Sequence, residues 1–190
     1  MNKFFVIFSL IAVALAELPE ECWQGQPDGK SPHECCQLKE AIPMALFEKC
    51  KSLFPPPPPG SHPKGCCMSE CVLSETKIFA EGKMNKDEAL KFLSKHFEGD
   101  AETIKVVHEA VEHCDKEYQT KKAGFDEMAK QPAAPGEKVC NMASGFLIGC
   151  VNAQIFLNCP KDKVAADASC GPIKSFIDKC GFLYPIKVVH

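Results

Sequence analysis

Thirteen cysteines in a chain of 190 residues are the side chains with the most chemistry available to them. In a reducing compartment, cysteines at ordered spacings suggest thiolate ligands for zinc. In an oxidising compartment the same cysteines pair into a disulfide framework that restrains the fold. The destination of the chain decides between these two chemistries.

The amino terminus favours the oxidising compartment. Residues 1–16 contain one basic residue, Lys3, then an apolar run, and close on Ala14-Leu15-Ala16, a small-x-small pattern that signal peptidase cleaves. The run is shorter than the roughly 20 residues needed to span a bilayer. We therefore expect a signal peptide at 1–16 and a secreted, extracellular single domain at 17–190, with its cysteines in disulfides and no membrane anchor.

The sequence does not favour nucleic-acid binding, zinc binding or phospholipase catalysis. The basic residues are all lysine, and the formal charge is −3, so a nucleic-acid partner is not expected. His108 and His113 lie five residues apart, a spacing that does not place two zinc ligands on one helical face. Secreted phospholipases A2 carry a histidine after their paired cysteines, whereas the comparable stretch here, Cys66 to Cys71, has none. We therefore predict no catalytic residue, metal or cofactor.

The elements that position the cysteines are predicted to be helices. Apolar residues from Ile104 to Tyr118 recur at spacings of three and four, after a cap at Asp100 or Thr103. Residues 142–157 are apolar on nearly every side, which is typical of a helix at the centre of a domain. Further helices are expected at 34–53 (bent at Pro43), at 66–79, from Asp87 to a stop at Gly99, and between Cys170 and Cys180. No alternating run is long enough to indicate a sheet.

Two segments are expected to lie outside the helices. Pro55–Pro59 is a five-proline run that should form a stiff polyproline II linker. The tail at 181–190 is apolar, and we expect it to fold back over the domain.

The cysteine spacings restrict how the helices can be joined. Cys67 and Cys71 are four residues apart, so on a helix they share a face and can link to two neighbours. Cys150 and Cys159 are nine apart, about 900° of helical rotation, so they leave opposite sides of the central helix. The expected result is a helical cage joined by disulfides around that helix.

These spacings resemble those of the insect odorant-binding proteins. That family has three residues between its second and third cysteines and eight between its fifth and sixth, as in Cys67-x3-Cys71 and Cys150-x8-Cys159 here. Cys114 would be the fourth cysteine and Cys36 the first. The Plus-C subgroup adds extra cysteines and a proline after the sixth, as in Cys159-Pro160. The resemblance covers Cys22 to Cys180.

The resemblance implies a fold and a disulfide pattern. The fold is all-α, a cage of about six to eight helices around an apolar cavity. The implied disulfides are Cys36–Cys71, Cys67–Cys150 and Cys114–Cys159, although the adjacent Cys35 or Cys66 could replace its neighbour. The other seven cysteines then form three more disulfides and leave one free thiol, which the sequence does not identify.

The resemblance also implies a carrier that binds and solubilises small hydrophobic molecules, such as odorants, without catalysis. A chemosensory receptor and a second copy of the chain are the further partners considered. The rival interpretation is a secreted, disulfide-rich protein-interaction module with a filled core. Inward-facing stripes and the tail supply the expected cavity wall: Phe79, Leu90, Leu93, Phe97, Val107, Val111, Phe146, Leu147, Val151, Phe182 and Tyr184.

Overall fold

A computed structural model describes residues 20–22, 27–28, 30–53, 66–130 and 139–180. The signal peptide expected at 1–16, the proline run at 55–59 and the apolar tail at 181–190 lie outside these residues. The extent of the domain, 17–190, therefore stays a prediction.

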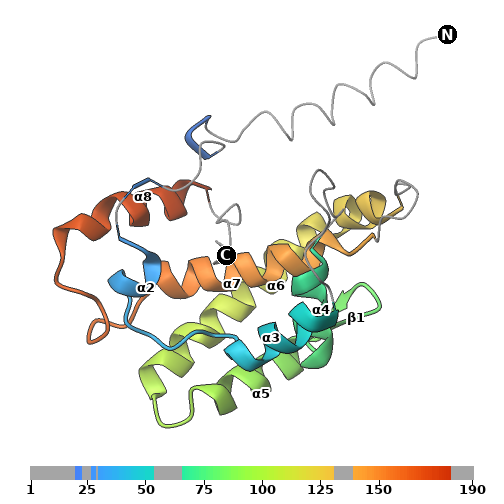
Figure 1. The fold of residues 1–190 in the computed structure, drawn as a ribbon, viewed down its shortest axis with the longest axis horizontal. Helices are drawn as coiled ribbons and strands as arrows, with labels where there is room; N and C mark the ends of the chain where they lie inside the picture. Colours follow the sequence, from blue (N-terminus) through green and yellow to red (C-terminus); the bar gives the residue numbers. More distant parts are fainter. Residues whose placement is uncertain (1–19, 23–26, 29, 54–65, 131–138, 181–190) are drawn as a thin grey trace.

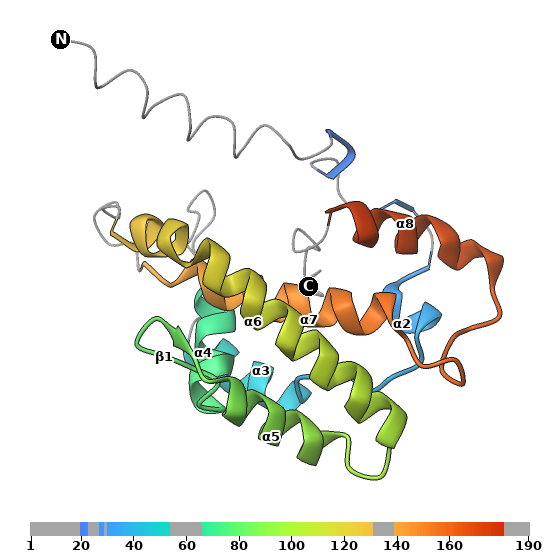
Figure 2. The ribbon, with the colours of Figure 1, turned by 180° about the vertical axis from the view of Figure 1, so that it is seen from behind.

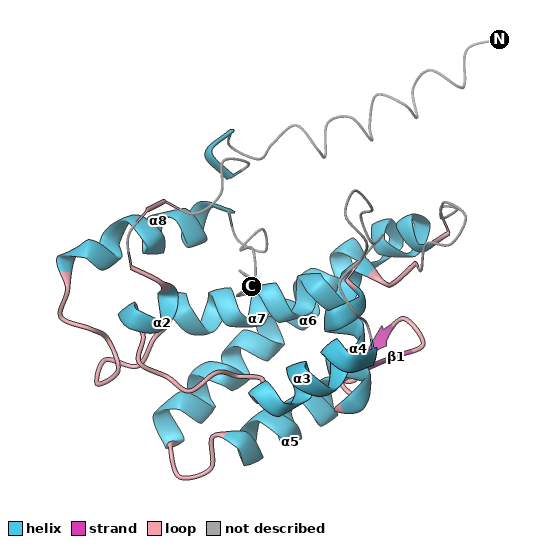
Figure 3. Cartoon of the chain, viewed as in Figure 1, coloured by secondary structure: helices cyan, strands magenta, loops and turns pink. Residues whose placement is uncertain are grey.

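The described part of the chain is mostly helical, as expected (Figure 1). It holds seven α-helices, two short 3-10 helices and one small hairpin. The helices are α2 (Pro32–Cys35), α3 (Met44–Leu53), α4 (Cys67–Glu75), α5 (Lys86–His96), α6 (Ala101–Ala129), α7 (Met142–Leu157) and α8 (Gly171–Cys180). The 3-10 helices are η1 (Glu20–Cys22) and η2 (Ala168–Cys170). The hairpin strands, β1 (Phe79–Ala80) and β2 (Lys83–Met84), are antiparallel and form a single two-stranded sheet (Figure 3).

The helix starts follow local capping chemistry. The Asp100 carboxylate accepts the Thr103 N–H at 3.0 Å, so Asp100 is the cap of α6. The Asn85 side chain accepts the Glu88 N–H, so α5 begins one residue before the expected Asp87. The predicted stop near Gly99 is confirmed, because α5 ends at His96 and Gly99 has a φ of +91°.

The helix expected at 34–53 is interrupted. It is replaced by α2 and α3, with extended chain between them at Cys36. There the Gln37 N–H donates to the Lys163 carbonyl at 2.9 Å, and the Ala165 N–H donates to the Cys35 carbonyl at 3.0 Å. Pro43 lacks an N–H and disfavours helix in the residue before it. Pairing with residues 163–165 satisfies backbone groups that the lost helix would have used.

The helix expected at 66–79 ends early, and a hairpin follows it. Lys77 has a φ of +59°, which turns the chain out of α4. Glu81 and Gly82, with φ of +52° and +72°, form the tight turn between the two strands. Strands of two residues leave no alternating pattern to detect, which is why the sequence did not predict them.

Helix α7 runs through the middle of the structure, as its composition predicted (Figure 1). Ten of its sixteen residues are buried. Helices α4 and α6 pack along it, α5 packs on α6, and α3 packs on α4 (Figure 2). Val107, Val111 and Tyr118 of α6 are fully buried in this main core, and the Tyr118 hydroxyl donates to the Gly82 carbonyl at 2.6 Å. The hairpin is thereby joined to α6.

A smaller core lies at the carboxyl end of α7. Ile173, Phe176 and Ile177 of α8 pack there against Ala153 and Phe156 of α7. Three disulfides cross-link the segments that surround this core: Cys22–Cys180, Cys35–Cys170 and Cys36–Cys159.

The disulfides number six, as expected, but their pairing differs from the one that the family resemblance implied. The other three are Cys50–Cys71, Cys67–Cys140 and Cys114–Cys150. The implied Cys36–Cys71, Cys67–Cys150 and Cys114–Cys159 are therefore wrong for this structure. The free thiol is Cys66.

Packing explains the difference. Cys71 faces α3, where Cys50 is fully buried, so it bonds there instead of reaching Cys36. Cys114 and Cys150 meet where α6 packs on α7, with their Cα atoms 5.9 Å apart. Cys159 lies beyond the end of α7, beside the extended chain that carries Cys36.

Helical spacing correctly predicted that Cys67 and Cys71 link α4 to two neighbours, the segment before α7 and helix α3. Cys150 and Cys159 bond to different partners, α6 and the segment after α2. Helix α7 ends at Leu157, so the expectation that Cys150 and Cys159 leave opposite sides of one helix is wrong, because Cys159 lies beyond that helix.

We expect peptide mapping without reduction to recover these six disulfides and one thiol, at Cys66. Proteolysis, mass spectrometry and alkylation of the unfolded, unreduced chain would provide the map. A Cys66–Cys140 peptide with Cys67 alkylated would contradict the arrangement at the start of α4.

Close contact between α4 and α7 predicts a steric effect at Gly145. A Cβ atom there would lie 2.1 Å from the Cys66 sulfur and 2.8 Å from the Cys66 Cβ. We expect Gly145→Ala to lower the free energy of unfolding by about 1–3 kcal/mol, as overpacking does. The measurement is urea denaturation followed by circular dichroism.

Two variants serve as controls for this prediction. Gly124→Ala on α6 meets open space and should stabilise the protein by up to about 1 kcal/mol. Adding Cys66→Gly to Gly145→Ala removes both clashing atoms and should restore stability. A double variant as unstable as Gly145→Ala would show that the clash is not the cause.

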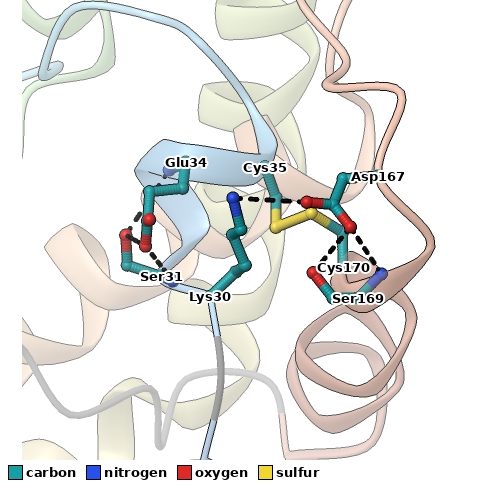
Figure 4. A network of polar contacts seen from close by, with 7 residues as sticks. All are labelled: Lys30, Ser31, Glu34, Cys35, Asp167, Ser169 and Cys170. Atoms are coloured by element: carbon teal, nitrogen blue, oxygen red, sulfur yellow. Dashed lines mark hydrogen bonds and ion pairs between the residues drawn. A yellow bond between two sulfur atoms is a disulfide. The ribbon is translucent and has the colours of Figure 1, made fainter.

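A network of polar contacts joins the segment before α2 to the segment before α8, beside the smaller core (Figure 4). Asp167 accepts the Ser169 N–H at 2.9 Å and the Ser169 hydroxyl at 2.7 Å, and it lies 3.2 Å from the Lys30 ammonium. These donors lower the pKa of Asp167 to about 2, the Ser169 hydroxyl contributing most. The Cys35–Cys170 disulfide bridges the same two segments.

The low pKa predicts an acid-dependent contribution to stability. Because folding lowers the pKa of Asp167 from 3.8 to about 2, its stabilising effect is complete above pH 3.8 and is lost as the pH falls through 2. Thermal denaturation should therefore find Asp167→Asn less stable than the parent at pH 5, with the difference shrinking toward pH 2. An equal change for Asp178→Asn, on the exposed side of α8, would attribute the effect to net charge.

Candidate functional site

The candidate site is a small apolar cavity inside the main core. Its volume is about 30 Å³. Side chains from α4, the hairpin, α5, α6, α7 and the segment before α3 line it. They are Ala41, Ile42, Leu73, Ile78, Met84, Ala89, Leu93, Val111, Leu147, Ile148, Val151 and Asn152.

Four of the eleven side chains expected to form a cavity wall line this cavity. They are Leu93 of α5, Val111 of α6, and Leu147 and Val151 of α7. The apolar stripes of α5 and α6 and the central helix α7 thus line the same cavity. Their contact with a ligand stays a prediction.

The other expected wall residues lie elsewhere. Phe79, Phe97, Val107 and Phe146 are buried in the same core but do not line the cavity. Leu90 packs half-buried against that core. Phe182 and Tyr184 fall outside the described residues.

The remaining wall residues were not predicted from the sequence, for different reasons. Ala89 lies four residues before Leu93, so the α5 stripe could have included it. Ile148 belongs to a helix without a polar face, where periodicity does not distinguish sides. Ile78 and Met84 come from the unpredicted hairpin, and Ala41 and Ile42 from the segment expected to be helical.

Hydrogen bonds to α5 secure the segment that carries Ala41 and Ile42. The Lys39 ammonium donates to the His96 carbonyl, and His96 Nε2 bonds the Glu40 carbonyl at 2.8 Å. The same ammonium lies 5.2 Å from the centre of the Phe97 ring, within reach of a cation–π contact. This part of the wall is therefore attached by polar contacts at its rim.

The size of the cavity limits what it can hold as it stands. A volume of about 30 Å³ is close to the space of one water molecule. Sites for small organic ligands are typically about 300–1,000 Å³. A ligand must therefore displace part of the wall, and the Met84 side chain, which is half-buried and has an unbranched thioether, can adapt most easily.

The lining of the cavity is almost entirely apolar. Asn152 is the sole side chain in the lining with a polar end group. The described residues contain no cluster of three or more side chains suited to holding a metal. His108 is half-buried and hydrogen-bonds the Ser94 hydroxyl at 2.7 Å, so it links α6 to α5. Burial raises the pKa of the Cys66 thiol, which disfavours its reactive thiolate.

None of the described helices is long and apolar enough to cross a membrane.

Comparison with known proteins identifies the family. A family model described as AgamOBP47-like matches residues 60–176. Odorant-binding protein 47 of Anopheles gambiae is 29% identical to this chain over 184 residues, which cover 93% of this chain and 81% of that protein. The match includes the cavity-lining residues of α4, the hairpin, α5, α6 and α7. Because the family model spans more than half of the sequence, the chain belongs to the AgamOBP47-like family, a group of insect odorant-binding proteins of the Plus-C type.

Proposed function

We propose that this protein is a carrier that binds and solubilises small hydrophobic molecules. The observation that supports this most directly is the apolar cavity, whose wall comes from six separate parts of the chain. Burial of an apolar ligand in such a site is favourable by roughly 25 cal/mol per Å². The family membership points to the same function.

The disulfides around the cavity support this proposal. Cys50–Cys71 fixes α3 to α4, and Cys114–Cys150 fixes α6 to α7. Val111 and Leu147 lie three residues before Cys114 and Cys150, about one helical turn away. The helices around the cavity can thus keep their positions while individual side chains move to admit a ligand.

The setting of the carrier is part of the proposal. A signal peptide at 1–16 would direct the chain to the extracellular space, where six disulfides form and persist. There the carrier would deliver its ligand, with a chemosensory receptor as the recipient. A second copy of the chain is a further partner, which sizing by gel filtration would detect.

One observation favours the rival function, a protein-interaction module with a filled core. The cavity is only about 30 Å³, and the buried side chains around it form one continuous core. A module of this kind would bind a partner protein through its surface and would not take up small apolar molecules. The two functions therefore differ in a single measurable property.

Titration with the fluorescent probe N-phenyl-1-naphthylamine should distinguish them. We expect saturable micromolar binding by the refolded mature protein with all six disulfides formed. Ala89→Leu places three extra carbons against the cavity and should weaken binding about tenfold.

The matched control is Ala101→Leu, at the exposed start of α6, which should leave binding unchanged. Circular dichroism would verify that both variants fold. Absence of saturable binding by the correctly bonded parent would eliminate the carrier function and leave the interaction module.

A further inference from the structure

A second hollow lies on the outside of the hairpin, open to solvent, with a volume of about 430 Å³. Three lysines line it, Lys77 before β1, Lys83 in β2 and Lys86 at the start of α5. Asp87 is the one carboxylate among its described lining residues. The hollow is therefore more cationic than a chain of net charge −3 would suggest.

Two of these lysines form no ion pair among the described residues. The Lys86 ammonium lies 3.1 Å from the Glu112 carboxylate of α6, so that charge is partly neutralised. Lys77 and Lys83 are exposed and have no ion-pair partner among the described residues. Two ammonium groups at one hollow favour an anionic group between them.

Met84 connects this hollow with the apolar cavity. Its side chain lines both spaces. In the hairpin register Met84 lies opposite the buried Phe79, whereas Lys83 lies opposite the exposed Ala80. Successive residues of β2 thus contribute to the polar hollow and to its apolar neighbour, with the flexible Met84 side chain between the two.

We propose that this protein takes a single-chain amphiphile with an anionic head group, such as a fatty acid. The alkyl chain enters the apolar cavity past Met84, and the carboxylate or phosphate head lies in the hollow between Lys77 and Lys83. The binding of the alkyl chain rests on the carrier function proposed above. The binding of the anionic head group rests on the lysine-lined hollow. Charged hydrogen bonds from ammonium groups are stronger than neutral ones, so the head group adds affinity and orientation.

Competition against N-phenyl-1-naphthylamine at pH 7.5 tests the proposal on the refolded mature protein. The competitors share a twelve-carbon chain and differ in the head group: dodecanoate, dodecyl phosphate, dodecanol and dodecyltrimethylammonium. We expect dodecanoate to bind about tenfold more tightly than dodecanol, and the ammonium compound more weakly than both. A preference for dodecyl phosphate instead would also support an anionic head and would assign it as a phosphate.

The variant Lys77→Gln/Lys83→Gln should abolish the preference for the anionic head while keeping the affinity for dodecanol. The control Lys161→Gln/Lys174→Gln removes the same amount of charge from exposed positions outside the hollow. It should retain the preference for the anionic head. If the first variant does not fold, 0.5 M NaCl with the parent protein provides a second measure, since screening should reduce the preference.

The outcomes separate the two proposals. Equal affinities of dodecanoate and dodecanol, or a preference that survives Lys77→Gln/Lys83→Gln, would overturn the anionic-head inference and leave the carrier function intact. Failure of the parent to bind the probe or any of the competitors would overturn both.

Discussion

The burial of α7 is the constraint on which the rest of the structure depends. A helix with apolar residues on nearly every side cannot face water, and fully burying each large apolar side chain stabilises the fold by about 1.5–3 kcal/mol. The other elements enclose it: α4 and α6 along its length, and α8 with the segment around Cys36 at its carboxyl end. Covering one helix from several directions brings distant parts of the chain together. It therefore also determines which cysteines can meet.

The disulfides follow from that packing. Cys114 and Cys150 bond because α6 and α7 meet there, and Cys36 bonds to Cys159 because extended chain pairs with the segment after α7. A family rule based on the order of cysteines cannot anticipate this when a chain has thirteen of them. Cys50 shows the difficulty: it lies in α3, beside α4, and takes the place that the rule gave to Cys36 as partner of Cys71. Rotation along a helix was a guide only for Cys67 and Cys71, which both lie within α4.

Local signals in the sequence predicted much of the fold and less of the site. The cap at Asp100 or Thr103 and the stripe from Ile104 to Tyr118 predicted the first part of α6, and the apolar composition of 142–157 predicted α7, because these signals are local. The break at Cys36 and the hairpin depend on contacts with residues far along the chain, which periodicity does not record. The same two elements supply Ala41, Ile42, Ile78 and Met84 to the cavity. About half of the wall that the sequence missed is thus built by long-range contacts, and the rest lies on predicted helices.

The parts of the cavity wall also differ in how firmly they are held. Helices α6 and α7 contribute Val111, Leu147 and Val151 from a frame that a disulfide holds together, so that side of the cavity is fixed. The rest of the wall includes Met84, on a hairpin of two-residue strands joined to α6 by the Tyr118 hydrogen bond, and the segment attached through Lys39 and His96. Replacing a few hydrogen bonds costs far less than moving cross-linked helices. A ligand that enlarges the cavity should therefore enter on the hairpin side, where the lysine-lined hollow adjoins it.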